Sequence, residues 1–83
     1  MLEDLKTGNK ISGVRQVTRA LKNDALQKVF WASDADPRVT EPIVALCAER
    51  NTEMEEVSTM TELGLACGIA VGSAVAAIVK SLP

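Results

Sequence analysis

Hydrophobic residues recur along the chain at two alternating spacings, one typical of helices and one typical of strands. The first helical stretch is marked by hydrophobic residues three or four positions apart, or adjacent: Val14, Val17, Ala20 and Leu21. They predict an amphipathic helix over residues 14–23. Ser12 or Gly13 can cap its start, and residues 10–12 form a short extended entry before it.

The middle of the chain predicts a strand followed by a second helix. Residues 28–32 are rich in β-forming side chains and end at an acidic turn over residues 33–37, in which Asp36 is expected to cap the turn. The second helix is marked by four spaced residues: Val39, Ile43, Leu46 and Cys47. Because an interior proline breaks helical hydrogen bonding, Pro42 places the expected start at Thr40 or Glu41, with one irregular turn before it. The helix should end near residues 50–51.

The rest of the chain predicts a strand, a short helix and a last strand. The strands are expected over residues 53–58 and 74–79, and the helix runs from Ser58 or Thr59 to about residue 66. Thr59 and Glu62 are spaced like a capping box. Strands that alternate with helices form a sheet covered on its faces. We therefore expect one domain over residues 1–83, an α/β fold with a three-layer α/β/α sandwich and a central mixed sheet of about four strands.

One uncharged run permits a different interpretation. Residues 63–79 carry no charge, and Gly64, Gly68 and Gly72 are spaced four apart, as on the face of a membrane helix dimer. A C-terminal membrane anchor is therefore an alternative. The run is short for a span and rich in small residues, and it divides naturally into a helix end, a glycine loop and a valine-rich strand. We expect no membrane contact.

Composition argues against catalysis and metal binding. The chain has no histidine, the commonest general base and zinc ligand. Cys47 and Cys67 have no partner at metal-binding spacing, and buried free thiols suit the reducing cytoplasm. The first residues are acidic and lack the apolar segment of a secretory signal. We expect a cytoplasmic protein with no enzymatic activity, no cofactor and no bound metal.

Charge is distributed unevenly along the chain. Six basic residues and one acidic residue fall between Lys6 and Lys28, whereas two basic and eight acidic residues fall between Trp31 and Glu62. Such asymmetry suggests an anionic partner for the basic half, although it also occurs in proteins without one. Trp31 itself is expected to be a strand residue covered by a helix.

Two stretches together resemble a known family. They are GVRQVTRAL over residues 13–21 and LGLACGI over residues 63–69, with the acidic turn DADP over 34–37 between them. In these features the chain is similar to the ribosomal protein L7Ae/L30e family, in particular to its short bacterial L7Ae-like members. The resemblance covers nearly the whole chain.

The resemblance implies recognition of the RNA kink-turn, a sharply bent internal loop with tandem sheared G·A pairs. The start of the first helix would enter the groove at these pairs, and the glycine loop over residues 64–71 would cover a flipped-out nucleotide. The RNA-binding residues expected by position are Gly13, Arg15, Gln16, Arg19, Lys22, Gly64, Cys67, Gly68, Ile69, Ala70 and Val71. Archaeal and eukaryotic relatives usually carry asparagine, glutamate and lysine where this chain has Arg15, Gln16 and Arg19, so the hydrogen bonds to the guanines are expected to differ.

The residues themselves support an anionic ligand. Arg15, Arg19 and Lys22 are four and three positions apart and share one helix face, with Gln16 adjacent. A helix start attracts phosphate, and arginine pairs guanine edges bidentately. Further phosphate contacts are expected from Lys10, Lys22 and Lys28. The alternative is that these cations form an ordinary solvated face.

The partner remains open on several points. A kink-turn occurs in ribosomal RNA, in riboswitches and in mRNA leaders, and association with the ribosome is possible from the resemblance. The acidic half could instead bind a basic protein, which would make the chain a protein-interaction module with a vestigial RNA face. Glu53, Glu55 and Glu56 are either a cation-chelating cluster or a solvated strand edge. We expect a monomer.

Overall fold

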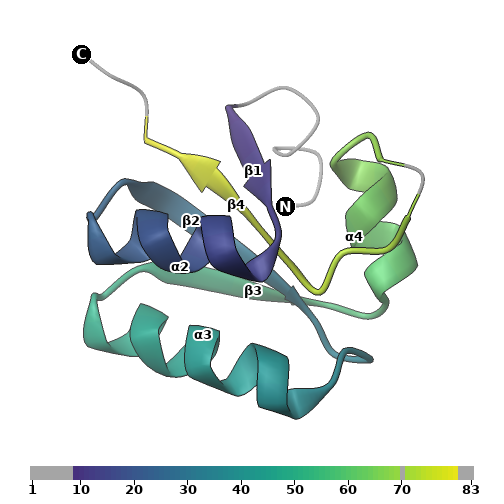
Figure 1. The fold of residues 1–83 in the computed structure, drawn as a ribbon, viewed down its shortest axis with the longest axis horizontal. Helices are drawn as coiled ribbons and strands as arrows, with labels where there is room; N and C mark the ends of the chain where they lie inside the picture. Colours follow the sequence, from purple (N-terminus) through teal and green to yellow (C-terminus); the bar gives the residue numbers. More distant parts are fainter. Residues whose placement is uncertain (1–8, 70, 81–83) are drawn as a thin grey trace.

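The computed structural model describes residues 9–69 and 71–80 (Figure 1). Its helices and strands follow one another as β1 (Lys10–Ser12), α2 (Val14–Lys22), β2 (Leu26–Ala32), α3 (Pro37–Glu49), β3 (Glu53–Val57), α4 (Met60–Ala66) and β4 (Val75–Val79). The four strands form one sheet in the order β1-β4-β2-β3. Strand β2 runs parallel to β3 and antiparallel to β4, and β1 is antiparallel to β4, so the sheet is mixed.

The sheet separates two hydrophobic clusters. Val17 and Leu21 of α2 and Ile43 and Cys47 of α3 pack together on one face, against Val29 and its neighbours. Helix α4 covers the other face, where Leu63 and Ala66 meet Phe30 and Ala32. Figure 1 shows α2 and α3 side by side, with α4 apart from them at one end of the strands. The predicted three-layer α/β/α sandwich is confirmed.

Local signals explain where most elements begin and end. Thr59 caps α4, since its hydroxyl oxygen accepts a hydrogen bond from the Glu62 backbone amide at 3.1 Å. The Asp34 carboxylate also accepts from the Met60 amide at 2.8 Å. Trp31 is a half-buried strand residue packed against the α2 and α3 side of the core, as predicted. The uncharged run divides into α4, a loop and β4, and in the described part of the chain no helix is long and apolar enough to cross a membrane.

The predicted start of the second helix was wrong. Helix α3 begins at Pro37, because Asp36 caps it and accepts a hydrogen bond from the Arg38 amide at 2.9 Å. Proline suits the first helical position, where its missing N–H has no partner to lose. Pro42 lies inside the helix without ending it, since Thr40, Ile43 and Cys47 are buried along the same face.

Two smaller expectations were also wrong. Strand β2 begins at Leu26, two residues earlier than predicted, and a register irregularity lies between Leu26 and Lys28. Val14 was expected in the buried stripe of the first helix, yet its side chain is 38% exposed. It occupies the first helical position, where α2 has not yet reached over the sheet, so the buried stripe consists of Val17 and Leu21.

Candidate nucleic-acid interface

The start of α2 is open to a ligand. Gly13 precedes the helix with φ at 98°, a conformation that L side chains rarely adopt, and an added Cβ there would meet nothing within 4 Å. No side chain caps the helix, and its first turn holds no acidic residue. The backbone amides of this turn therefore point toward open space together with the positive end of the helix dipole, which is an arrangement that favours an anion.

The outward face of α2 is polar and basic. Arg15, Gln16, Arg19 and Lys22 are all exposed, on the side away from the buried stripe. None of the three cations lies within ion-pair distance of a carboxylate in the described residues. The sequence prediction of a shared basic face is therefore confirmed as geometry, and its charges are available for a partner.

Three other cations are neutralised within the chain. Arg38 pairs with Asp36 at 2.9 Å, and Arg50 pairs with Asp24 at 3.3 Å. Lys28 lies 2.8 Å from a Glu55 carboxylate oxygen and 3.2 Å from one of Glu53, and its side chain is 13% exposed. The predicted phosphate contact by Lys28 is contradicted by these ion pairs.

The Lys28 ion pairs also explain the acidic strand β3. The hydrogen bond from Lys28 raises the pKa of its ammonium and lowers the pKa of the Glu55 carboxyl. The Lys28 ammonium also lies 5.1 Å from the centre of the Phe30 ring. Among the described residues, no three side chains of metal-ligating type gather in one place. The carboxylates of Glu53 and Glu55 thus serve to hold a lysine on the sheet.

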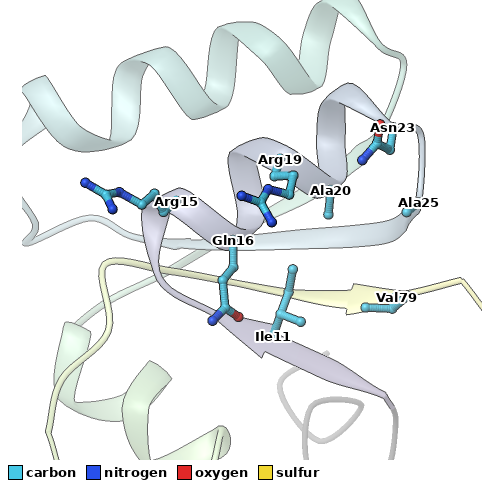
Figure 2. A pocket seen from close by; sticks show the side chains of 8 residues that line it. All are labelled: Ile11, Arg15, Gln16, Arg19, Ala20, Asn23, Ala25 and Val79. Atoms are coloured by element: carbon cyan, nitrogen blue, oxygen red, sulfur yellow. The ribbon is translucent and has the colours of Figure 1, made fainter.

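A groove follows the exposed side of α2 beside the edge of the sheet (Figure 2). Its volume is about 440 Å³. Three predicted site residues, Arg15, Gln16 and Arg19, line it together, and Lys22 borders the neighbouring hollow on α2. The remaining lining residues are Ile11, Ala20, Asn23, Ala25 and Val79. The structure therefore brings the predicted helix contacts to one concave surface.

The glycines of the second motif have different roles. Gly64 is buried in α4, and a Cβ built on it would collide with the Val71 carbonyl oxygen. Because Gly64 has no side chain, α4 can pack closely against Val71 and Gly72 in the loop that leads to β4. Gly64 therefore positions this loop through packing, without facing a ligand. Gly68 is exposed with φ at 79° and open space around it. It is the motif glycine whose backbone a ligand can approach.

The remaining loop residues divide between core and surface. Cys67 is 8% exposed and belongs to the core under α4. Burial raises the pKa of its thiol, against the smaller opposing effect of the Lys10 charge. Ile69 packs partly against the same core, whereas Val71 is 71% exposed. Ala70 lies outside the described residues.

The two predicted segments meet through strand β4. The Gly13 amide donates a hydrogen bond to the Val75 carbonyl oxygen at 3.1 Å, and Val75 is the first residue after the loop. The Ser73 hydroxyl donates to the same oxygen at 2.7 Å. Figure 1 shows the start of α2 and the α4–β4 loop at the same end of the sheet.

Two surface residues were missed by the sequence reasoning. Leu65 is 66% exposed on α4 within the second motif, because Leu63 and Ala66 take the buried positions. The helical spacing of those neighbours could have indicated it. Asn23 ends α2 and borders the groove, but no local pattern sets it apart from an ordinary helix end.

Comparison with known proteins identifies the family. The model of the ribosomal protein L7Ae/L30e/S12e/Gadd45 family matches residues 2–81. An RNA-binding protein of Bacillus pumilus is 41% identical over 68 residues, which cover 82% of this chain and 83% of that protein. The large ribosomal subunit protein eL8 of Halobacterium salinarum is 38% identical over 76 residues, which cover 90% of this chain and 63% of that protein.

The fold comparison agrees. The solved structure of the Giardia lamblia 15.5kD RNA binding protein matches with a TM-score of 0.90 at 24% identity, over 96% of this chain and 71% of that chain. At this identity the match supports the fold alone, which is the same three-layer arrangement. The sequence and fold comparisons thus agree, and the chain belongs to the ribosomal protein L7Ae/L30e/S12e/Gadd45 family.

Proposed function

We propose that this chain is a cytoplasmic RNA-binding protein that recognises kink-turn RNA and holds it in its bent form. The observation that carries the proposal is the uncapped start of α2, where Arg15, Arg19 and Lys22 share an exposed face and have no carboxylate partner among the described residues. Relatives that cover most of this chain are named RNA-binding proteins. Binding that favours only the bent RNA shifts its population toward that form, and this requires no chemistry.

Each part of the surface has a role in the proposal. Arg15 and Gln16 read the guanine edges of the tandem G·A pairs, since guanidinium and amide groups match these edges in one plane. Arg19 and Lys22 bind the phosphates beside the pairs, and the exposed Lys10 of β1 adds a further phosphate contact. Gly68 and Val71 cover the flipped-out nucleotide with backbone and an apolar side chain, while Gly64 and Cys67 act from within the core to shape the loop.

The proposed surface indicates the kind of RNA structure that is bound, not one particular RNA. Ribosomal RNA, riboswitches and mRNA leaders all carry kink-turns, and one relative is a large ribosomal subunit protein. The protein acts as a monomer in this proposal, because one copy of α2 and its adjoining loop makes up the whole contact surface.

The test is a fluorescence titration with two RNAs. The first contains a kink-turn, and the second is identical except that Watson–Crick pairs replace the tandem G·A pairs. We expect tight binding to the first and a large loss with the second. Equal, weak and salt-sensitive binding to both would contradict structure-specific recognition, since it is the signature of phosphate attraction alone.

A further inference from the structure

The groove beside α2 extends beyond the residues that the proposed function uses. Arg15, Gln16 and Arg19 occupy its side nearest the helix start. The rest of its surface comes from β1, β4 and the end of α2 (Figure 2). The proposed function assigns no role to this far part of the groove. Its lining residues are Ile11, Ala20, Asn23, Ala25 and Val79.

The far part combines an apolar floor with polar groups at its rim. Ile11, Ala20 and Val79 pack against the core beneath and leave apolar atoms facing the groove. Asn23 stands at the rim as an exposed amide, and its side chain has no hydrogen bond within the described residues. Such an amide can both donate to and accept from one ligand. The guanidinium of Arg19 is placed between this amide and the helix start.

The basic rim and the apolar floor together indicate which class of ligand fits the groove. Asp24 directly follows Asn23, but its carboxylate is engaged by Arg50 at 3.3 Å, so the rim remains basic. A free phosphate would leave the apolar floor unused, and a purely apolar ligand would leave Arg19 and Asn23 unused. A nucleobase has an apolar face, a hydrogen-bonding edge and a phosphate attached, and guanidinium groups stack on it.

We propose that this groove holds one unstacked nucleobase of the bound RNA, beyond the kink itself. The inference rests on the proposed function, because the kink-turn places the RNA strand along α2. Asn23 follows the nine residues of α2, and it therefore lies about 13 Å along the axis from the helix start.

The test uses abasic nucleotides, which keep the phosphates and remove the bases. A kink-turn RNA is made with a short unpaired tail on the strand beside the G·A pairs, and a second copy carries an abasic tail. We expect the protein to bind the first about tenfold more tightly, since stacking one base contributes roughly 1–3 kcal/mol.

Two variants and a control assign the effect to the groove. Ala20→Leu fills the floor and Asn23→Ala removes the amide, and each should abolish the preference for the tail with bases. Gln27→Ala removes an exposed amide outside the groove and should keep it. Circular dichroism will show whether Ala20→Leu disturbs the fold. If it does, the result for Asn23→Ala alone decides whether the groove binds the base.

The outcomes separate the two proposals. Equal binding of both tailed RNAs by the unmodified protein, with the G·A dependence intact, would overturn the nucleobase site and leave kink-turn recognition standing. A preference that survives both groove variants would overturn it as well. Loss of G·A dependence itself would overturn the proposed function and, with it, this inference.

Discussion

Helices α2 and α3 lie side by side on one face of the sheet, but their starts are built in opposite ways. At α3, the Asp36 carboxylate caps the helix and also receives the Arg38 guanidinium at 2.9 Å, so donors and charges are satisfied locally. At α2, glycine precedes the helix, no side chain caps it, and Arg15 and Arg19 have no carboxylate beside them in the described residues.

The difference separates a helix end that stabilises the fold from one that is open to a ligand. A side-chain cap typically contributes about 1 kcal/mol, and α2 lacks that contribution. Its stability must come instead from Val17 and Leu21, which are almost fully buried. An exposed helix end with unsatisfied donors and unpaired cations is what an anionic partner requires. Four experiments test whether the two helix starts differ in this way.

The largest effect is expected when α2 receives a carboxylate like that of α3. Val14→Asp places an acidic group in the first turn at a position that is 38% exposed. Affinity for kink-turn RNA should fall about 100-fold, because like charges in an interface cost several kcal/mol. The free energy of unfolding should change by less than about 1 kcal/mol, since the helix dipole favours the new charge.

Val14→Asn is the matched control for this change. It has nearly the same shape as Val14→Asp without the charge, and it should bind RNA within a few-fold of the unmodified protein. RNA titration and chemical denaturation of both variants provide the measurements. If the aspartate and asparagine variants bind RNA equally well, the start of α2 does not face phosphate.

A second experiment compares one arginine from each helix. Arg19→Ala should weaken kink-turn binding about tenfold, within the roughly 1–3 kcal/mol that a well-placed arginine contributes. Arg38→Ala removes the same charge from α3 and should change binding by less than about twofold, because that cation is already paired with Asp36. Equal losses for the two variants would indicate that the RNA responds to overall charge alone.

The sequence predicted the order of elements well because hydrophobic spacing determines it. The buried stripe of α2, the acidic turn and the uncharged run each carried a local signal. The start of α3 was mispredicted because two prolines gave opposite signals. Pro37 with Asp36 forms a strong start, and the burial of Ile43 and Cys47 outweighs the hydrogen bond that Pro42 removes. Local rules do not rank such terms against tertiary burial.

The candidate site was predictable where its residues are close in sequence. Arg15, Gln16 and Arg19 share a face by helical spacing alone, and the structure gathers them in one groove. Lys28 was misjudged because its partners Glu53 and Glu55 belong to the parallel strand β3, and no local pattern reveals that register. Asn23 could not be assigned to the groove from the sequence, because the groove exists only where β4 packs beside α2 and contributes Val79 to its lining.

Pro42 offers a third experiment, which acts on α3 alone. Pro42→Ala restores a backbone N–H that can donate to the Arg38 carbonyl oxygen four residues earlier. We expect the free energy of unfolding to rise by about 1 kcal/mol, because one intramolecular hydrogen bond contributes roughly that much and alanine is the better helix former. Thermal and chemical denaturation measure it. Unchanged or lower stability would show that the helix had already adapted to the proline, and RNA binding should not change.

The smallest effect concerns pH and the α3 cap. The hydrogen bonds from Arg38 hold the pKa of the Asp36 carboxyl below its ordinary value. A carboxyl with a lowered folded-state pKa stabilises the fold above its unfolded-state pKa, and this contribution is lost as pH falls through the folded-state pKa. Asp36→Asn keeps an oxygen for the cap and removes the charge. The unmodified protein should therefore be slightly more stable than this variant at neutral pH and equal to it in acid.

The Arg38→Ala background tests whether the pH effect comes from this ion pair. Without the guanidinium, the pH-dependent difference between Asp36 and its asparagine variant should shrink, since the side-chain hydrogen bonds from Arg38, the main cause of the lowered pKa of Asp36, are gone. The measurement is the free energy of unfolding of all four proteins at neutral and acid pH. A difference that persists in acid would mean that the cap responds to side-chain shape, not charge. RNA affinity should stay within about twofold throughout, because Asp36 and Arg38 are paired with each other, whereas Arg15, Arg19 and Lys22 of α2 have no carboxylate partner among the described residues.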